Sequence, residues 1–172
     1  MDGIAWAASA MAAAQARLEI AVQNLANGSS DGFRKSLVRG WMQARGVRVV
    51  PVRDDEQGAL RRTGRAFDRA IVGRGSFVVC DAGGHIVQTR DGAFSRDRSG
   101  RLRDDLGRSL LRTSLEPGAY VRSGFLESSN VDAISEMVNV LEAERSFETA
   151  QKVLSAIDQT SAQASSRMSE FK

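Results

Sequence analysis

The fold of this chain is decided by residues 4–32, IAWAASAMAAAQARLEIAVQNLANGSSDG, where an alanine-rich stretch runs into a turn of glycine, serine and asparagine. Apolar positions recur at alternating steps of four and three residues, interrupted only by Gln15, which places them on one narrow stripe of a helix. The stripe consists of Ile4, Ala8, Met11, Leu18, Val22 and Leu25. Asn27 and Gly28 tolerate the left-handed backbone that ends helices. We therefore expect a helix that ends near Asn27 and buries this stripe against a second helix.

The other end of the chain follows the same pattern. An apolar series in steps of three and four consists of Val140, Ala143, Phe147, Ala150, Leu154 and Ile157, and after the polar Ser161 it resumes at Ala164, Met168 and Phe171. A second stripe, formed by Ile134, Val138 and Leu141, predicts that the beginning of this helix is buried on a wider face. Helices with such narrow stripes are poorly stable alone, so we expect the two terminal helices to pack on each other or on copies in an assembly.

The residues between the two helices have the composition of short strands and tight turns. Candidate strands at 70–72, 77–79 and 85–89 are separated by glycine-rich reversals, and Pro51 indicates an edge strand or a strand end. Candidate core aromatic residues are Phe67, Phe77 and Phe94. We expect an α+β fold in which paired, coiled-coil-like N- and C-terminal helices flank an antiparallel all-β domain. The expected parts are residues 1–33 for the first helix, 34–122 for the β-rich domain with its extended entry segment, and 123–172 for the second helix.

Charge is distributed unevenly along the 172 residues. The formal net charge is +3, but residues 34–122 carry 19 cations and 10 anions, whereas both ends of the chain are net acidic. One cysteine and one histidine exclude an internal disulfide and a Cys/His zinc cluster. No apolar run reaches the roughly 18 residues of a membrane span. The alanine-rich N-terminal stretch lacks the basic region of a signal peptide, so we interpret it as helix.

No set of residues indicates catalysis or the binding of a cofactor or metal. Gly73-Arg74-Gly75 lacks the third glycine and the following helix of a dinucleotide-binding loop. Residues 54–56 and 104–105 are acidic, but they lack the ligand spacing of a calcium loop and are interpreted as solvated turns. His85 has no nucleophile at a catalytic spacing. We therefore expect a protein that is not an enzyme.

The arginines of the middle segment admit two interpretations. Arg61, Arg62 and Arg65, with others after them, could follow a nucleic-acid backbone, so a basic nucleic-acid-binding module is the alternative function. Few aromatic residues are interleaved with these arginines, which argues against a stacking platform. Arginine also suits protein interfaces, because its planar fork pairs with carboxylates. A DNA titration that finds no salt-dependent binding would remove the nucleic-acid alternative.

Four ordered blocks of the sequence resemble the bacterial flagellar rod and hook proteins. Residues 8–35 resemble their N-terminal helix and turn, with NLAN at 24–27 and GFR at 32–34 matching the family's N-x-L-A-N and G-F-K/R. Residues 63–79 resemble T-G-x-x-x-D-L-A-I-x-G-x-G-F-F, and residues 89–102 resemble T-R-x-G-x-F-x-x-D-x-x-G-x-L. The series GFLESSNVD at 124–132, EMV at 136–138 and EAERSFE at 142–148 is similar to the family's C-terminal G-x-L-E-x-S-N-V-D, E-M-V and E-A-Q-R-A-Y-E.

The resemblance is closest to the proximal and distal rod proteins, and it implies a structural subunit of the basal body. The terminal helices would form an inner tube, and the β-domain would project outward. The chain would be exported unfolded by the flagellar type III apparatus into the cell envelope, where it would polymerise with copies of itself and with other rod and hook proteins. We expect neither a nucleic-acid partner nor insertion into a membrane.

The resemblance also assigns candidate assembly residues. Those expected in the helical core are Leu18, Val22, Asn24, Leu25, Asn27, Phe147, Leu154 and Ile157. Among them, Leu18, Val22 and Leu25 are predicted to pack against Phe147, Leu154 and Ile157. Arg61, Arg62 and Arg65 are expected on the outer β-surface, where they would face acidic helix ends.

The chain departs from the family pattern in length and at three positions. About a dozen residues separate Leu111 from Gly124, where longer members carry a further β-rich insertion. Arg69, Arg74 and Ser76 stand where leucine, an acidic residue and phenylalanine are usual. We therefore expect a short form that lacks part of the outer β insertion.

Overall fold

The computed structural model describes the backbone of residues 2–43 and 46–170 and the side chains of residues 3–43 and 46–163. The chain forms two compact units. The helical unit contains the described residues up to Leu25, the segment Ser36–Val52 and the described residues from Ala133 onward. The strand unit contains Ala26–Lys35 and Arg53–Asp132. Residues 36–52, expected from the sequence to enter the β-rich domain, thus group with the helices.

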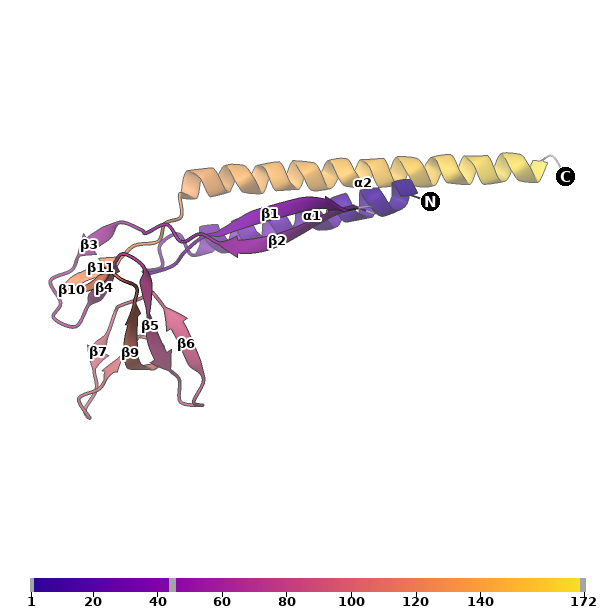
Figure 1. Cartoon of the computed structure of the whole chain (residues 1–172). Helices are drawn as coiled ribbons and strands as arrows, with labels where there is room; N and C mark the ends of the chain where they lie inside the picture. Colours follow the sequence, from indigo (N-terminus) through magenta and orange to yellow (C-terminus); the bar gives the residue numbers. More distant parts are fainter. Residues whose placement is uncertain (1, 44–45, 171–172) are drawn as a thin grey trace. The chain divides into compact units, whose positions relative to one another are not determined.

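Two helices and a hairpin form the helical unit (Figure 1). Helix α1 spans Asp2–Ala26, helix α2 spans Ala133–Glu170, and strands β1 (Ser36–Gln43) and β2 (Gly46–Arg53) form a two-stranded sheet. The helices run side by side in opposite directions. The start of α1 lies beside the second half of α2, since a Cβ at Gly3 would lie 3.5 Å from Ile157 Cδ1. The end of α1 lies beside the start of α2, since Asn24 and Glu136 border one pocket. The hairpin lies along α1, where the Val47 N–H donates to Ser9 Oγ. Within the described residues, neither helix has the length and apolar character needed to cross a membrane.

The buried face of α1 differs from the stripe predicted from the sequence. It consists mainly of small residues, namely Ala7, Ala13, Ala14, Ile20, Ala21 and Asn24. Ile4, Ala8 and Val22 of the predicted stripe are exposed, whereas Met11, Leu18 and Leu25 are half-buried. The physical reason is that α1 has neighbours on two sides, and alanine lets both α2 and the hairpin approach closely.

Within the chain, the first stripe predicted for α2 is at least half-buried from Val140 to Ile157, and the second is exposed. The side chains of Ala164, Met168 and Phe171, which continue the first stripe, lie outside the described residues. Ala143 and Ala150 are buried, and Val140, Phe147, Leu154 and Ile157 are half-buried. Ile134, Val138 and Leu141 are exposed instead of forming a wider buried face. Among the described residues of the helical unit, α1 covers one narrow side of α2, and the side chains of the second stripe remain exposed to solvent.

The strand unit is antiparallel throughout its described pairings. Its central sheet has the order β6-β5-β9-β8-β7, and two further pairs are β10-β4 and β11-β3. The strands are β3 (Leu60–Arg62), β4 (Arg69–Val72), β5 (Gly75–Cys80), β6 (Ile86–Thr89), β7 (Ser95–Arg96), β8 (Leu102–Arg103), β9 (Ser109–Leu115), β10 (Tyr120–Ser123) and β11 (Phe125–Glu127). The expected α+β layout, with two terminal helices flanking antiparallel strands in the chain, is confirmed.

A small apolar core holds the strand unit together. It consists of Ile71, Phe77, Val79 and Phe94. The rings of Phe77 and Phe94 meet edge to face, with their centroids 5.2 Å apart. These two predicted core aromatics are confirmed, but Phe67 is exposed in the turn before β4. The core is small because most strands have only two to four residues.

Three reversals in the strand unit share the pattern Asp-x-x-Gly, at residues 81–84, 97–100 and 104–107. In each turn the glycine N–H donates to the aspartate carbonyl, and the aspartate N–H donates to the carbonyl of the residue after the glycine. Each aspartate carboxylate accepts the backbone N–H of that same residue. The glycines have φ between 76° and 84°, a conformation that side chains with a Cβ rarely adopt. These local bonds close the hairpins without help from the core.

Candidate assembly surfaces

An exposed apolar stripe lies along the first half of α2. It consists of Ile134, Met137, Val138 and Leu141, which are 75%, 54%, 48% and 56% exposed. Their spacing of three and four residues places them on one face of the helix. We call this group the α2 stripe. Exposed apolar patches of this kind mark sites of protein interaction.

The hairpin of the helical unit adds further exposed apolar side chains. In β1 these are Leu37, Val38, Trp41 and Met42. Seven of the eight residues of β1 are exposed, so both faces of this strand present side chains to solvent. The helical unit therefore presents apolar surface from a strand as well as from a helix.

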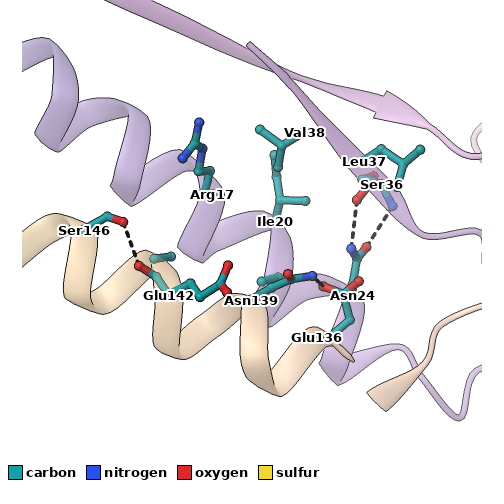
Figure 2. Close-up of a pocket in the computed structure, with 12 residues that line it drawn as sticks. Arg17, Ile20, Asn24, Ser36, Leu37, Val38, Glu136, Asn139, Glu142 and Ser146 are labelled. Carbon is teal, nitrogen blue, oxygen red and sulfur yellow. Dashed lines mark hydrogen bonds between the residues drawn. The ribbon is translucent and has the colours of Figure 1, made fainter. Parts of the chain in front are cut away.

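Asn24, a predicted assembly residue, is used inside the helical unit. Its side chain is almost completely buried, its Nδ2 donates to the Ser36 carbonyl at 2.8 Å, and its Oδ1 accepts the Ser36 N–H at 2.8 Å. Figure 2 shows these two hydrogen bonds between the end of α1 and the start of β1. The Asn24 amide thus satisfies both backbone groups of Ser36, as a neighbouring strand would, and it holds the hairpin on α1.

A pocket of about 340 Å³ lies between α1, β1 and α2 (Figure 2). Arg17, Ile20 and Asn24 border it from α1, and Glu136 and Glu142 border it from α2. Glu136 is buried and accepts a hydrogen bond from Asn139 Nδ2. Polar side chains of both helices therefore line this pocket together with the apolar Ile20, Ala21 and Ala143.

The structure does not bring the predicted helical pairs together within one chain. Because the helices are antiparallel and Gly3 lies against Ile157, Leu154 and Ile157 lie beside the beginning of α1. Leu18, Val22 and Leu25 lie toward the other end, beside residues near Glu136. Inside one chain Leu154 and Ile157 therefore lie away from Leu18, Val22 and Leu25, and the packing of these three residues on Phe147, Leu154 and Ile157 stays a prediction for the assembled rod. Asn27 is half-buried and its Oδ1 accepts a hydrogen bond from Ser30.

Two of the three predicted surface arginines form ion pairs within the strand unit. Arg61 contacts Asp31 at 2.9 Å, and Arg65 forms a two-pronged pair with Asp68. Burial disfavours the charged form of Asp68, but hydrogen bonds from Arg65 and Thr63 outweigh it and keep the pKa of the carboxyl below its usual value. Arg62 is exposed on β3, opposite Phe125. Of the three, Arg62 is therefore the one whose charge is available to a partner.

A buried charge network that the sequence did not reveal lies at the centre of the strand unit. Arg90 and Glu127 are each about 2% exposed or less, and Arg90 Nε donates to Glu127 Oε2 at 2.8 Å. The Arg90 guanidinium also donates to the carbonyls of Ile71, Gly73 and Gly75. Glu127 Oε1 accepts the Gly58 N–H and lies 3.7 Å from Arg34. The available signal was the position of Arg90 and Glu127 inside two family blocks, TRDG and GFLE.

Comparison with known proteins places this architecture among flagellar components. A family model described as the flagellar hook protein FlgE/F/G D1 domain matches residues 70–140, and one described as the flagellar basal body rod FlgEFG protein C-terminal matches residues 122–167. The flagellar basal-body rod protein FlgG of Agrobacterium fabrum is 23% identical over 252 aligned positions, covering 92% of this chain and 96% of that protein. That alignment is longer than this chain, so the relative contains residues that have no counterpart here.

Two other relatives are more similar over shorter regions. The flagellar hook protein FlgE of Brucella abortus is 32% identical over 149 residues, covering 80% of this chain and 37% of the hook protein. The flagellar basal-body rod protein FlgF of Mesorhizobium japonicum is 32% identical over 119 residues, covering 64% of this chain and 49% of the relative. This chain therefore matches about a third of the hook protein and half of the second rod protein.

Proposed function

Because this chain belongs to the flagellar rod and hook family of structural proteins, which are not enzymes, we propose that it is a subunit of the basal-body rod. It polymerises through its terminal helices into a helical tube. A single contact between unlike surfaces, repeated with a constant rotation, generates such a tube without any further source of order. Its place is the flagellar basal body, reached through the flagellar type III export apparatus.

The α2 stripe carries this proposal. Removing apolar surface from water is favourable by about 25 cal/mol for each square ångström, so covering four large apolar side chains on one face of a helix favours association. Neighbouring copies, or other rod and hook proteins, cover the stripe in the assembled tube. Val22 of α1 is also exposed and suits the same role.

The extent of the alignments favours a rod position over a hook position. The rod relative from Agrobacterium aligns along 96% of its own length, whereas the hook relative aligns along 37%. The residues that this chain lacks relative to the longer rod protein support a short form without part of the outer β insertion. In the assembled rod, residues 1–33 and 123–172 form a coiled-coil-like core, and the β-rich domain at 34–122 makes lateral contacts.

The predicted assembly residues differ in how well they suit this role. Leu18, Leu25, Phe147, Leu154 and Ile157 are half-buried and keep apolar surface for a neighbour. Asn24 does not, because both of its polar atoms are bonded to Ser36. Among the arginines, Arg62 is the residue whose charge reversal tests lateral contacts, because Arg62→Glu breaks no ion pair in the described structure.

The test is incorporation of the full chain into basal bodies of its own bacterium. We expect Val138→Glu with Leu141→Glu to abolish incorporation and motility, because two charges would enter the covered stripe. The matched control, Gln151→Glu with Gln159→Glu, adds the same charge at exposed positions of α2 and is expected to incorporate normally. Normal incorporation of the stripe variant, measured by immunoblot of purified basal bodies, contradicts the proposal.

A further inference from the structure

The strand unit contains a pocket lined by four arginines. The pocket has a volume of about 280 Å³, and its arginines come from four separate segments: Arg34 before β1, Arg53 at the end of β2, Arg74 in the β4–β5 turn and Arg90 after β6. The acidic residues in its lining are Asp55 and Glu116. Even when the buried Glu127 is counted with them, four guanidinium groups face three carboxylates.

The arginines of the pocket are unequally satisfied. Arg90 is fully engaged by Glu127 and three backbone carbonyls. Arg34 contacts Asp55 at 3.3 Å, but its Nε is buried and has no hydrogen-bond partner in the described structure, although the side chain is only 6% exposed. Arg53 and Arg74 are exposed, and within the described residues their side chains take part in no hydrogen bond or ion pair. The pocket thus has spare donors both at its base and at its rim.

The arginines of the pocket are close enough for their charges to affect one another. Burial lowers the pKa of Arg90, and the neighbouring charges of Arg34 and Arg53 lower it further, against the opposing effect of Glu127. Like charges are costly when they are held together around partly buried groups. An anion in the pocket would relieve that repulsion, and the planar guanidinium fork matches the two oxygens of a carboxylate or a phosphate.

We propose that this pocket is an oxyanion site, and that its ligand in the assembled rod is a glutamate or aspartate carboxylate from a neighbouring copy. The identity of the ligand as a carboxylate of a neighbouring copy rests on the proposed function. The chain offers suitable carboxylates, because Glu142, Glu144 and Glu148 of α2 are exposed and form no ion pair in the described structure. The contact would join the basic strand unit of one copy to an acidic helix of the next.

The first test measures anion binding to the purified full chain. Inorganic phosphate is titrated at constant ionic strength while the arginine Nε–H signals are followed by NMR. We expect saturable shifts of the Arg34 and Arg90 signals, and their loss in Arg53→Ser with Arg74→Ser, a change that leaves the buried network intact. The matched control, Arg98→Ser with Arg112→Ser, removes the same charge at exposed positions and should bind as the unmodified chain does. Absence of saturable shifts, or equal loss in the control, overturns the oxyanion site.

The second test identifies the source of the anion. A synthetic peptide of residues 139–151 is compared with the same peptide carrying glutamine at positions 142, 144 and 148. We expect the acidic peptide to bind at least about tenfold more tightly, a difference of roughly 1.4 kcal/mol, and to compete with phosphate. Binding of phosphate without this preference overturns the subunit carboxylate and leaves a site for a free ion.

Basal-body incorporation separates this inference from the proposed function. We expect the Arg53→Ser, Arg74→Ser variant to incorporate at least about tenfold less than its control, since the lost contact is repeated at every subunit. Normal incorporation of that variant overturns the carboxylate contact while the proposed function stands. Normal incorporation of the α2 stripe variant overturns the proposed function, whereas phosphate binding by the pocket would persist.

Discussion

Removal of Arg90 should be among the most damaging single changes in the strand unit. The Arg90→Met variant keeps much of the side-chain volume but deletes five hydrogen bonds, two to Glu127 and three to backbone carbonyls. Glu127 would retain only the Gly58 N–H at 3.3 Å and Arg34 at 3.7 Å. Breaking one partner of a buried ion pair costs about 3–5 kcal/mol, against a total stability of about 5–15 kcal/mol for a domain.

The second partner and the double variant give the prediction its internal control. Glu127→Leu leaves Arg90 buried without a carboxylate and is expected to cost a similar amount. In the double variant both charges of the Arg90–Glu127 pair are removed together, so its cost should fall short of the sum of the two single costs by at least about 2 kcal/mol. Arg90→Lys retains the charge with fewer donors and should cost about 1–3 kcal/mol, which keeps the prediction testable if the larger changes prevent folding.

The assay must report on the strand unit alone. Amide hydrogen exchange of Ile71, Phe77 and Val79, which lie in the buried strands β4 and β5, gives the free energy of opening that unit. Single variants that lower this free energy by less than about 1 kcal/mol would refute the reasoning, since such a cost is that of an exposed ion pair. Strict additivity in the double variant would also refute it.

Three further predictions concern other parts of the chain. Asn24→Ala should lower the free energy of unfolding of the helical unit by about 2–3 kcal/mol, because the Ser36 backbone loses two hydrogen bonds. The control Gln15→Ala, on the exposed face of α1, should change this free energy by less than about 0.5 kcal/mol. Urea unfolding followed by tryptophan fluorescence measures both. In Gly92→Ala the new Cβ would overlap the Arg69 carbonyl oxygen, so this variant should cost at least about 3 kcal/mol. Gly118→Ala has open space around the new Cβ and only the strain of its φ of +85°, about 1–2 kcal/mol. Thermal unfolding distinguishes the two variants. The lowered pKa of Asp68 contributes stability that is present above its usual pKa of 3.8 and is lost as the pH falls through the lower value in the folded protein. Between about pH 5 and about pH 2, the free energy of unfolding should therefore fall less in Asp68→Asn than in the unmodified chain. An equal fall in both proteins would contradict this prediction.

The structure also explains why one stripe of α2 is at least half-buried within the chain and the other is exposed. Periodicity identifies which side chains share a face, as it did for Val140, Phe147 and Leu154. It does not say whether a given face is covered by the same chain or by another one. Ile134, Val138 and Leu141 have the spacing of a buried face, but their side chains are exposed in the single chain. Under the proposed function, a neighbouring copy covers that face.

The buried charges could not be predicted because their partners are distant in the chain. Arg90 and Glu127 are 37 residues apart, and Arg90 also bonds to carbonyls 15 to 19 residues away. In the sequence each is one charged residue among many arginines and acids. Only the folding of β4, β5 and β11 around a common centre removes both from water, which converts two ordinary charges into a required pair. The arginine pocket arises in the same way, from four separate segments.

The sequence by itself determined the features that depend on residues within a few positions of one another. These are the two helices with their capping turn, the antiparallel hairpins and the Asp-x-x-Gly reversals, whose bonds all close within four residues. The tertiary structure alone decided which face of α1 is buried, that Asn24 holds the hairpin at Ser36, and which arginines remain free. The physical reason is that local backbone geometry follows from short-range sterics and hydrogen bonding. Burial and charge pairing depend on which distant segments share the same space.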